Sequence, residues 1–229
     1  MATFVKFTLN GKSCLAEEGQ PLVAAAKECG VYIPTLCNYP GIPPKGACRI
    51  CTVLINGLPA TACTTKVVEG MNVQTSTPEL EAFRMAVVEI LFAEGNHLCP
   101  SCEKSGSCEL QALAYRYRMT VPRFPYLFPK RDVEAWHPKI LKDHNRCIQC
   151  KRCIRGIHNE AGQAVFAFGK RGDRVVINID PETSKTVSDE LAQQAMDLCP
   201  VGAILRKEKG FDVPIGRRKY DRTPIGSEV

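Results

Sequence analysis

The stretch Cys147-Ile148-Gln149-Cys150-Lys151-Arg152-Cys153 holds three cysteines with two residues between neighbours, and Cys199-Pro200 follows far downstream. Two cysteines at C-x2-C spacing belong to one tight turn, so their thiolates reach neighbouring coordination positions of a metal centre. Soft, anionic sulfur ligands suit iron in both of its redox states. A cysteine triplet that is completed by a distant Cys-Pro pair therefore predicts a small domain folded around a [4Fe–4S] cluster.

The positions that would hold a second cluster in such a domain contain no thiol. In two-cluster bacterial ferredoxins, each C-x2-C-x2-C-x3-C-P run lends its fourth cysteine to the other cluster. Here the fourth position of the first run is Ile157, and the three positions that precede Cys199 at the matching spacing are Asp189, Ala192 and Ala195. We therefore expect a ferredoxin-like domain with one cluster, whose ligands are Cys147, Cys150, Cys153 and Cys199.

Four cysteines near the N-terminus have the plant-ferredoxin arrangement for a [2Fe–2S] cluster, although their first gap is ten residues and not four. Gly46 and Ala47 keep bulk away from this loop, so backbone N–H groups can approach the cluster sulfurs. A structural zinc site is the alternative, but the outer two cysteines do not form the second C-x2-C pair that zinc modules usually use. The four cysteines are Cys37, Cys48, Cys51 and Cys63.

Between these groups, Cys99, Cys102 and Cys108 make an incomplete ligand set. His97 is the nearest donor, and we expect it to complete a second [4Fe–4S] site. An imidazole ligand is neutral where a thiolate is charged, so it should shift the cluster potential in the direction seen for Rieske centres. The alternatives are closure by water, by a partner or by a distant histidine. The distant candidates are His137 and His144.

Local signals place short elements around these groups. The turn pairs Asn10-Gly11 and Asn56-Gly57 predict β-hairpins, and the segment 76–79 predicts a capped helix that runs to about Glu94. The expected inward face of that helix consists of Leu80, Phe83, Val87, Ile90 and Leu91. The other expected elements are strands at 3–9, 52–55, 59–62, 67–75, 164–168 and 175–179, and helices at 21–29, 109–119 and 188–198.

These elements predict an α+β chain of small units. The basic tail is either solvated and partly extended or a docking arm for an acidic partner. The expected units are an N-terminal β-grasp [2Fe–2S] ferredoxin-like domain (1–77), a short helical His/Cys₃ cluster domain (78–119), an ordered connector (120–142), a bacterial-ferredoxin-like domain with one [4Fe–4S] cluster (143–205) and the basic C-terminal tail (206–229).

Composition narrows the class of protein. The net charge of +6 is modest, and the basic residues are not interleaved densely enough with aromatic ones to indicate nucleic-acid binding. No apolar run approaches the roughly 18 residues that span a bilayer, and no secretory signal opens the chain. Thirteen cysteines, mostly in tight groups, then indicate reduced thiols and a cytoplasmic protein. Cys14 and Cys29 lack partners at ligand spacing and are expected to be small buried residues.

In their order, the motifs resemble the small diaphorase subunit of soluble NAD-reducing [NiFe]-hydrogenases, a relative of the N-terminal part of the large peripheral subunit of complex I. The resemblance covers essentially the full length. In complex I and the iron-only hydrogenases, the histidine lies three residues farther from the first cysteine of its group, whereas here only Leu98 intervenes. The matching segments are Gly46–Cys51, Gly95–His97, Cys99–Gln111, Cys147–Cys153 and Pro214–Tyr220.

The resemblance implies a heteromeric hydrogen:NAD⁺ oxidoreductase. A partner subunit would carry FMN and bind NAD, the small and large hydrogenase subunits would carry the [NiFe] centre, and this chain would relay electrons one at a time through three clusters. We expect no catalytic site in the chain, because it lacks a G-x-G-x-x-G fingerprint, a P-loop and paired C-x2-C motifs for nickel. The alternatives are the equivalent subunit of a formate dehydrogenase or of complex I, or a zinc-stabilised interaction protein.

Overall fold

The computed structural model describes residues 3–229 as a mixed α and β chain, which agrees with the α+β class expected from the sequence. The first unit is a five-stranded sheet with the order β2-β1-β5-β3-β4, and α1 packs against it through Leu22, Ala25 and Ala26. Its elements are β1 (Phe4–Leu9), β2 (Lys12–Glu17), α1 (Leu22–Glu28), β3 (Thr52–Ile55), β4 (Leu58–Thr61) and β5 (Asn72–Gln74).

The turn signals predict the two hairpins of this sheet correctly. Asn10 and Asn56 both have positive φ and each is followed by a glycine with positive φ, as a two-residue hairpin turn requires. The expected strand at 67–75 is shorter in the structure and begins only at Asn72. Val67 instead donates its backbone N–H to Gln20, and the turn at Gly70 separates this contact from β5.

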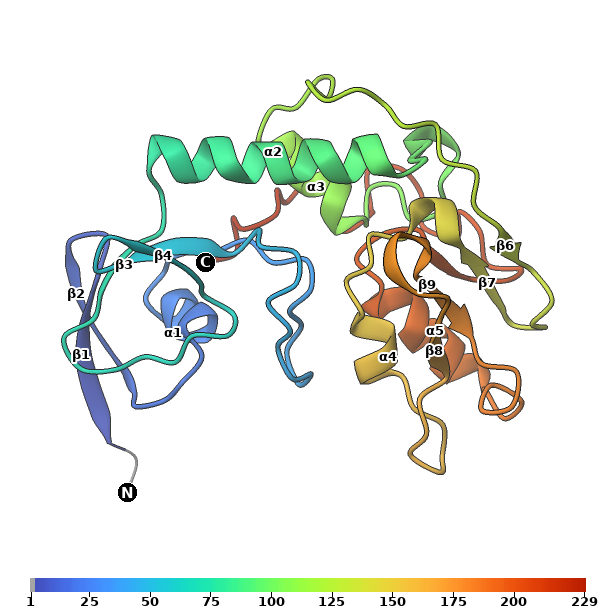
Figure 1. Cartoon of the computed structure of the whole chain (residues 1–229), viewed down its shortest axis with the longest axis horizontal. Helices are drawn as coiled ribbons and strands as arrows, with labels where there is room; N and C mark the ends of the chain where they lie inside the picture. Colours follow the sequence, from blue (N-terminus) through green and yellow to red (C-terminus); the bar gives the residue numbers. More distant parts are fainter. Residues whose placement is uncertain (1–2) are drawn as a thin grey trace.

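The middle unit consists of α2 (Pro78–Glu94), the short 3₁₀ turn η1 (Cys99–Ser101) and α3 (Glu109–Arg116). In Figure 1, α2 extends from the first unit towards the last one. The Thr77 side chain accepts a hydrogen bond from Leu80 N–H and so caps the helix as predicted.

The predicted inward face of α2 is partly wrong. Leu80 is buried and Val87 and Leu91 pack against the core, but Phe83 and Ile90 are 41% and 40% exposed. Two charged side chains, Arg84 and Glu89, are buried in their place. Both have partners outside the helix, so an apolar periodicity could not reveal which face turns inward.

The last unit combines a three-stranded sheet of order β10-β7-β6, a β8–β9 hairpin and two helices. The sequence predicts the hairpin and the second helix, but neither the three-stranded sheet nor α4. Its elements are β6 (Val133–Glu134), β7 (Ile140–Asp143), η2 (His144–Arg146), α4 (Arg152–Gly156), β8 (Phe166–Gly169), η3 (Gly172–Arg174), β9 (Val176–Ile179), α5 (Asp189–Leu198) and β10 (Ile204–Arg206).

The three units pack as a continuous body. One buried apolar cluster spans the middle and last units and also includes Leu36 and Ile50 of the first unit, while a second cluster fills the β-grasp sheet. No helix among residues 3–229 has the length and apolar character needed to cross a membrane.

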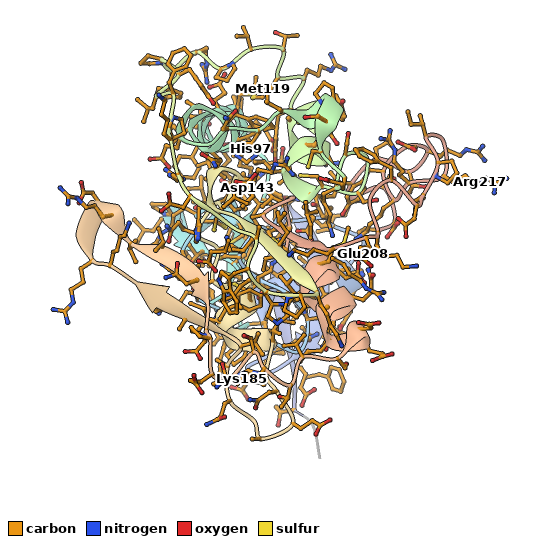
Figure 2. All side chains as sticks on the ribbon, turned by 90° about the vertical axis from the view of Figure 1, so that its right-hand side faces the viewer. His97, Met119, Asp143, Lys185, Glu208 and Arg217 are labelled. Atoms are coloured by element: carbon orange, nitrogen blue, oxygen red, sulfur yellow. The ribbon has the colours of Figure 1, made fainter. Side chains whose placement is uncertain are left out.

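The C-terminal tail has no helix or strand after β10, but it is anchored. Tyr220 donates its backbone N–H to Gly106, and Arg116 donates to the carbonyl of Ile225, which is itself buried. Gly226 lies against the ring of Tyr32, so the tail returns to the first unit, where Figure 1 places the C-terminus. Figure 2 shows the basic Arg217 at the outer edge of this tail.

We predict that Arg84→Met destabilises the contact between α2 and the first unit. Arg84 is 2% exposed and donates to the carbonyls of Ile50 (3.2 Å) and Thr52 (2.8 Å), which would lose their partner. Hydrogen bonds from a charged donor contribute about 1.5–3 kcal/mol. The melting temperature should fall by about 5–10 °C, measured by calorimetry on the purified chain. The exposed Arg118 supplies the control, and an equal loss in Arg118→Met would contradict the assignment.

Candidate iron–sulfur sites

The structure brings Cys37, Cys48, Cys51 and Cys63 together at one end of the first unit. The Cys37 thiol contacts those of Cys48 and Cys63, and these hydrogen bonds lower its pKa to about 2. Backbone N–H groups of Ala47 and Cys48 also favour the Cys37 thiolate. The expectation that this loop lets backbone amides approach the sulfurs therefore agrees with the geometry.

The four thiols of this first site divide into two pairs by pKa. Hydrogen bonds lower the pKa of Cys37 and Cys51, and the same bonds raise the pKa of their proton-sharing neighbours Cys48 and Cys63. Gly46 has a φ of +63°, and a Cβ there would lie 3.2 Å from a methyl carbon of Thr64. The loop thus favours a residue without a side chain two positions before Cys48.

The second site is a small cavity between η1, α3 and the start of β10. Cys99, Cys102, Cys108 and His97 all line it. Local sequence signals indicate Gly95 only as a helix stop, but a Cβ there would lie 2.2 Å from His97 Nε2. Glycine at this position therefore makes room for the imidazole.

The His97 ring is prepared to act as a neutral donor. Burial lowers its pKa to about 4, so the ring carries no charge near neutral pH. The backbone of Leu91 favours a proton on the ring, whereas the buried Nε2 has no hydrogen-bond partner among the described residues. A neutral imidazole with one nitrogen engaged by a carbonyl and the other free is the usual state of a metal-binding histidine.

The two other histidines considered for this site have partners elsewhere. His137 Nε2 lies 3.2 Å from the Ser184 carbonyl, and its Nδ1 accepts from the backbone N–H of Ile140. His144 Nε2 lies 2.9 Å from a carboxylate oxygen of Glu134. Neither lines the cavity that contains the three cysteines.

The third site is a cavity in the last unit, lined by Cys147, Cys150, Cys153 and Cys199. Burial is the main reason that the pKa of Cys153 rises to about 12 and that the pKa of Cys150 is raised well above its ordinary value. Thiolates at these positions therefore need a positive centre beside them, which iron would supply. Among residues 3–229, no three His, Cys, Asp or Glu side chains converge as ligands of a single metal ion.

The positions of the missing second ferredoxin cluster are filled by apolar packing. Ile157, Ala192 and Ala195 are fully buried and belong to the core cluster that spans the middle and last units. The fourth position, Asp189, faces solvent and pairs with Lys139 and Arg206. The described side chains leave one cysteine-lined cavity in this unit.

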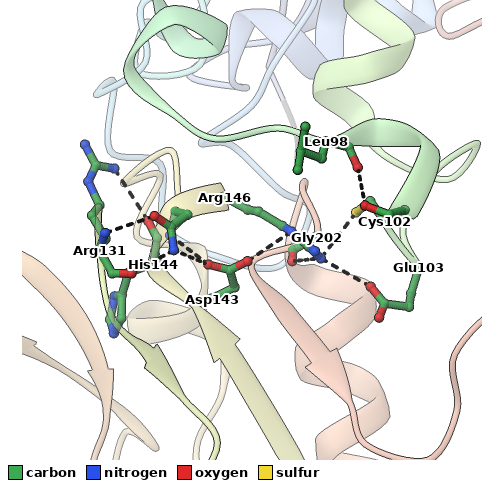
Figure 3. A network of polar contacts seen from close by, with 10 residues as sticks. Leu98, Cys102, Glu103, Arg131, Asp143, His144, Arg146 and Gly202 are labelled. Atoms are coloured by element: carbon green, nitrogen blue, oxygen red, sulfur yellow. Dashed lines mark hydrogen bonds and ion pairs between the residues drawn. The ribbon is translucent and has the colours of Figure 1, made fainter. Parts of the chain in front are cut away.

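Two arginines connect the three sites. Arg155 donates to the carbonyls of Cys37 (2.8 Å) and Cys150 (3.4 Å), and so bridges the first and third sites. Arg146 lies directly before Cys147 and approaches Cys102 Sγ (3.6 Å), as Figure 3 shows. The third site is therefore in contact with both of the others through these side chains.

Close packing also joins the second and third sites. The backbone N–H of Glu109, directly after Cys108, donates to the Pro200 carbonyl (2.8 Å), directly after Cys199. A Cβ on Gly202 would lie only 2.4 Å from Cys102 Sγ. Nothing in the local sequence indicates that this glycine borders another site.

The two cysteines outside the sites differ from expectation. Cys14 and Cys29 are only partly buried, and the Cys14 thiol donates to the carbonyl of Lys12. Burial, followed by the nearby Cys14 thiol, raises the pKa of Cys29 to about 11. The sheet places β2 beside the end of α1, a proximity that sequence spacing does not encode.

Three family models match the chain. They are a 2Fe-2S iron-sulfur cluster binding domain over residues 2–78, the NADH-ubiquinone oxidoreductase-G iron-sulfur binding region over 84–123 and the ferredoxin-like domain of NADH-quinone oxidoreductase subunit 3 over 137–205. The chain is also 36% and 33% identical to the mitochondrial NADH-ubiquinone oxidoreductase 78 kDa subunits of Neurospora crassa and Candida albicans. It spans only 28% and 29% of those two proteins.

Two further relatives match over nearly their whole length. A crystal structure of NAD⁺-reducing [NiFe]-hydrogenase in the H₂-reduced state contains a chain that is 37% identical, with a TM-score of 0.88 and coverage of 97% of this chain and 96% of that one. The gamma subunit of the NAD-reducing hydrogenase HoxS of Cupriavidus necator is 49% identical over 218 residues, which are 95% of this chain and 93% of the relative. This chain therefore belongs to the family of the gamma subunits of NAD-reducing hydrogenases.

Proposed function

We propose that this chain is the electron-transfer subunit of a cytoplasmic NAD-reducing hydrogenase, and that it carries electrons singly between a [NiFe] hydrogenase module and a flavin/NAD module. The observation that carries the proposal is the set of three separate cysteine-rich sites within one continuously packed chain. A protein that binds metal for stability alone has no need of three sites linked to one another. Similarity to the HoxS gamma chain along nearly the whole length supports this assignment.

We assign the ligands as the sequence predicts. A [2Fe–2S] cluster and two [4Fe–4S] clusters, when bound, each accept and release one electron. The chain's own residues hold them, exclude water and set their electrostatic surroundings. The assigned ligands are Cys37, Cys48, Cys51 and Cys63 for the [2Fe–2S] cluster, His97, Cys99, Cys102 and Cys108 for one [4Fe–4S] cluster, and Cys147, Cys150, Cys153 and Cys199 for the other.

We further infer that the third site holds the middle cluster of the electron-transfer chain. Arg155 joins it to the first site, and Arg146 and the Glu109–Pro200 bond join it to the second. The first and second sites would then face the partner modules. The FMN, NAD and [NiFe] groups belong to those partners in this proposal, namely the flavin-bearing diaphorase subunit and the small and large hydrogenase subunits.

The proposal predicts the composition and activity of the native complex. The chain, isolated anaerobically with its partners, should be brown, bleach with dithionite and contain about ten irons, the sum of one [2Fe–2S] and two [4Fe–4S] clusters. The same complex should reduce NAD with hydrogen. Colourless chain that contains zinc would refute the relay. Iron-loaded chain that co-purifies with formate dehydrogenase or complex I subunits would favour the equivalent role in those enzymes, to which the complex I relatives point.

Substitutions at His97 test the unusual ligand. His97→Cys should keep the second cluster but lower its potential, because a charged thiolate replaces a neutral imidazole. His97→Ala should lose or disable the cluster, as seen by EPR of the reduced chain. The exposed His158 provides the control, and His158→Ala should leave all signals unchanged. An unaltered second-cluster signal and potential in His97→Ala would mean that another group is the ligand.

Gly202→Ala should disrupt the second cluster without replacing a ligand. The added methyl group would lie 2.4 Å from Cys102 Sγ, so the thiolate must move out of its ligating position. We expect about four fewer irons per chain, since a [4Fe–4S] cluster is lost. At Gly210, a Cβ would meet only Glu103 Cγ at 3.3 Å, so Gly210→Ala is the matched control. Full iron content in Gly202→Ala would show that Cys102 does not hold the cluster.

A further inference from the structure

Lys142 has a buried charge that cluster ligation does not use. Its side chain is 1% exposed and lies in the middle of β7, between Glu134 of β6 and Ile204 of β10. Its Nζ has no hydrogen-bond partner among the described residues. The same side chain lines the cavity that contains Cys147, Cys150, Cys153 and Cys199.

An ammonium group in such a place is expensive unless a negative charge compensates it. Burial of an unpaired charge costs several kcal/mol, and the surrounding wall is largely apolar, with Ile177, Val201 and Ala203. A methionine of similar length would avoid this cost. The lysine therefore indicates that the cavity holds something anionic.

The nearest carboxylates in the sheet already have partners. Asp143, the next residue of β7, pairs with Arg146 Nε at 3.0 Å. Glu134, opposite Lys142 on β6, accepts from His144 Nε2 and from the backbone N–H of Ile179. The four cysteines are thus the anionic groups left to Lys142 when they bind a cluster as thiolates.

The other cations that line the second and third cavities are paired with carboxylates or open to water. Arg152 lines the same cavity but forms a bidentate pair with Glu109. Lys151 also lines it, but its side chain is partly exposed, so solvent screens its charge. At the second site, Arg146 is offset by Asp143 and Glu103. Lys142 is the cation of these four that is both buried and unpaired.

We propose that the Lys142 ammonium is the countercharge of the third cluster and raises its reduction potential. A [4Fe–4S] cluster bound by four thiolates is a net anion, and the electron that it accepts adds one further negative charge. A fixed cation stabilises the reduced form more than the oxidised form, and the low local dielectric strengthens this effect. In the proposed relay the third cluster would take one electron from a neighbouring cluster, which would be oxidised by one electron, and Lys142 would keep its protons throughout.

The inference rests on the proposed function, because it requires a cluster at the third site. It also explains why a relay would place a lysine there. The second cluster has a neutral histidine among its ligands, and this raises its potential relative to a four-thiolate cluster. A middle cluster with four thiolates and no countercharge would have a lower reduction potential, so electron transfer to it from the second cluster would be energetically unfavourable. Lys142 brings the reduction potential of the third cluster closer to that of the second.

The test is an EPR-monitored redox titration of the assembled complex that contains Lys142→Met or Lys142→Gln. The midpoint potential of the third cluster should shift to more negative values, while those of the other two clusters stay nearly unchanged. Lys170→Met removes the same charge from an exposed position of the same unit and should shift nothing. An unchanged midpoint of an intact third cluster in the Lys142 variants, or an equal shift in Lys170→Met, would overturn the proposal.

A measurement on the unaltered complex decides the matter if the variants fail to assemble the third cluster. With ¹⁵N in the lysine side chains, pulsed EPR of the reduced third cluster should show a hyperfine coupling to a lysine nitrogen. Absence of that coupling would overturn the role of Lys142. The two proposals fail separately, because chain without iron refutes the relay, whereas iron-loaded chain with an indifferent Lys142 refutes only this inference.

Discussion

The structure depends on a largely buried ion pair, in which Arg152 of the last unit binds Glu109 of the middle unit. The guanidinium binds both carboxylate oxygens of Glu109, at 2.8 and 2.7 Å, and also donates to the Leu198 carbonyl at 3.3 Å. The ring of Tyr39 lies 5.2 Å from the guanidinium carbon. Each partner is a close sequence neighbour of an assigned ligand, since Glu109 follows Cys108, Leu198 precedes Cys199 and Tyr39 lies two residues after Cys37. A single side chain therefore contacts residues that lie beside all three proposed sites.

Such a pair contributes more to geometry than to stability. Desolvation offsets much of the attraction between buried charges, and an apolar replacement is often neutral or stabilising. A planar guanidinium, by contrast, accepts its partners only in a fixed fork arrangement. Electron transfer between clusters falls steeply with distance, so a relay requires sites that cannot drift apart. Arg155 and Arg146 extend the same principle, because each bonds directly to a ligand residue of a neighbouring site.

The sequence predicts the parts of this protein that local chemistry determines. Cysteine spacing identifies the groups that the structure brings together, and Asn-Gly pairs identify the hairpin turns because few residues adopt the required backbone. The cap at Thr77 is equally local, and α2 begins where that residue indicates. Each of these features is encoded within a few neighbouring positions.

The parts that the sequence did not predict depend on distant partners. Arg84 turns inward because carbonyls of the first unit receive it, and Gly202 matters because a cysteine far along the chain lies against it. The sheet of β6, β7 and β10 escaped prediction because strands of two to four residues carry too little periodicity. Cys14 and Cys29 are likewise brought close by the fold, and their spacing in the sequence does not reveal this proximity.

Apolar side chains fill the position of the second cluster of two-cluster ferredoxins, and this has a consequence for the proposed path of electrons. Ile157, Ala192 and Ala195 occupy three positions that hold cluster ligands in two-cluster ferredoxins, and their side chains pack α4 against α5. This packing steadies Cys199 at the end of α5 and Cys153 within α4, two proposed ligands that lie far apart in the sequence. A second cluster here would offer electrons a side branch on the face of α5. With apolar side chains in its place, the last unit holds one cysteine-lined cavity, flanked by the other two sites, and the proposed route through it is unbranched.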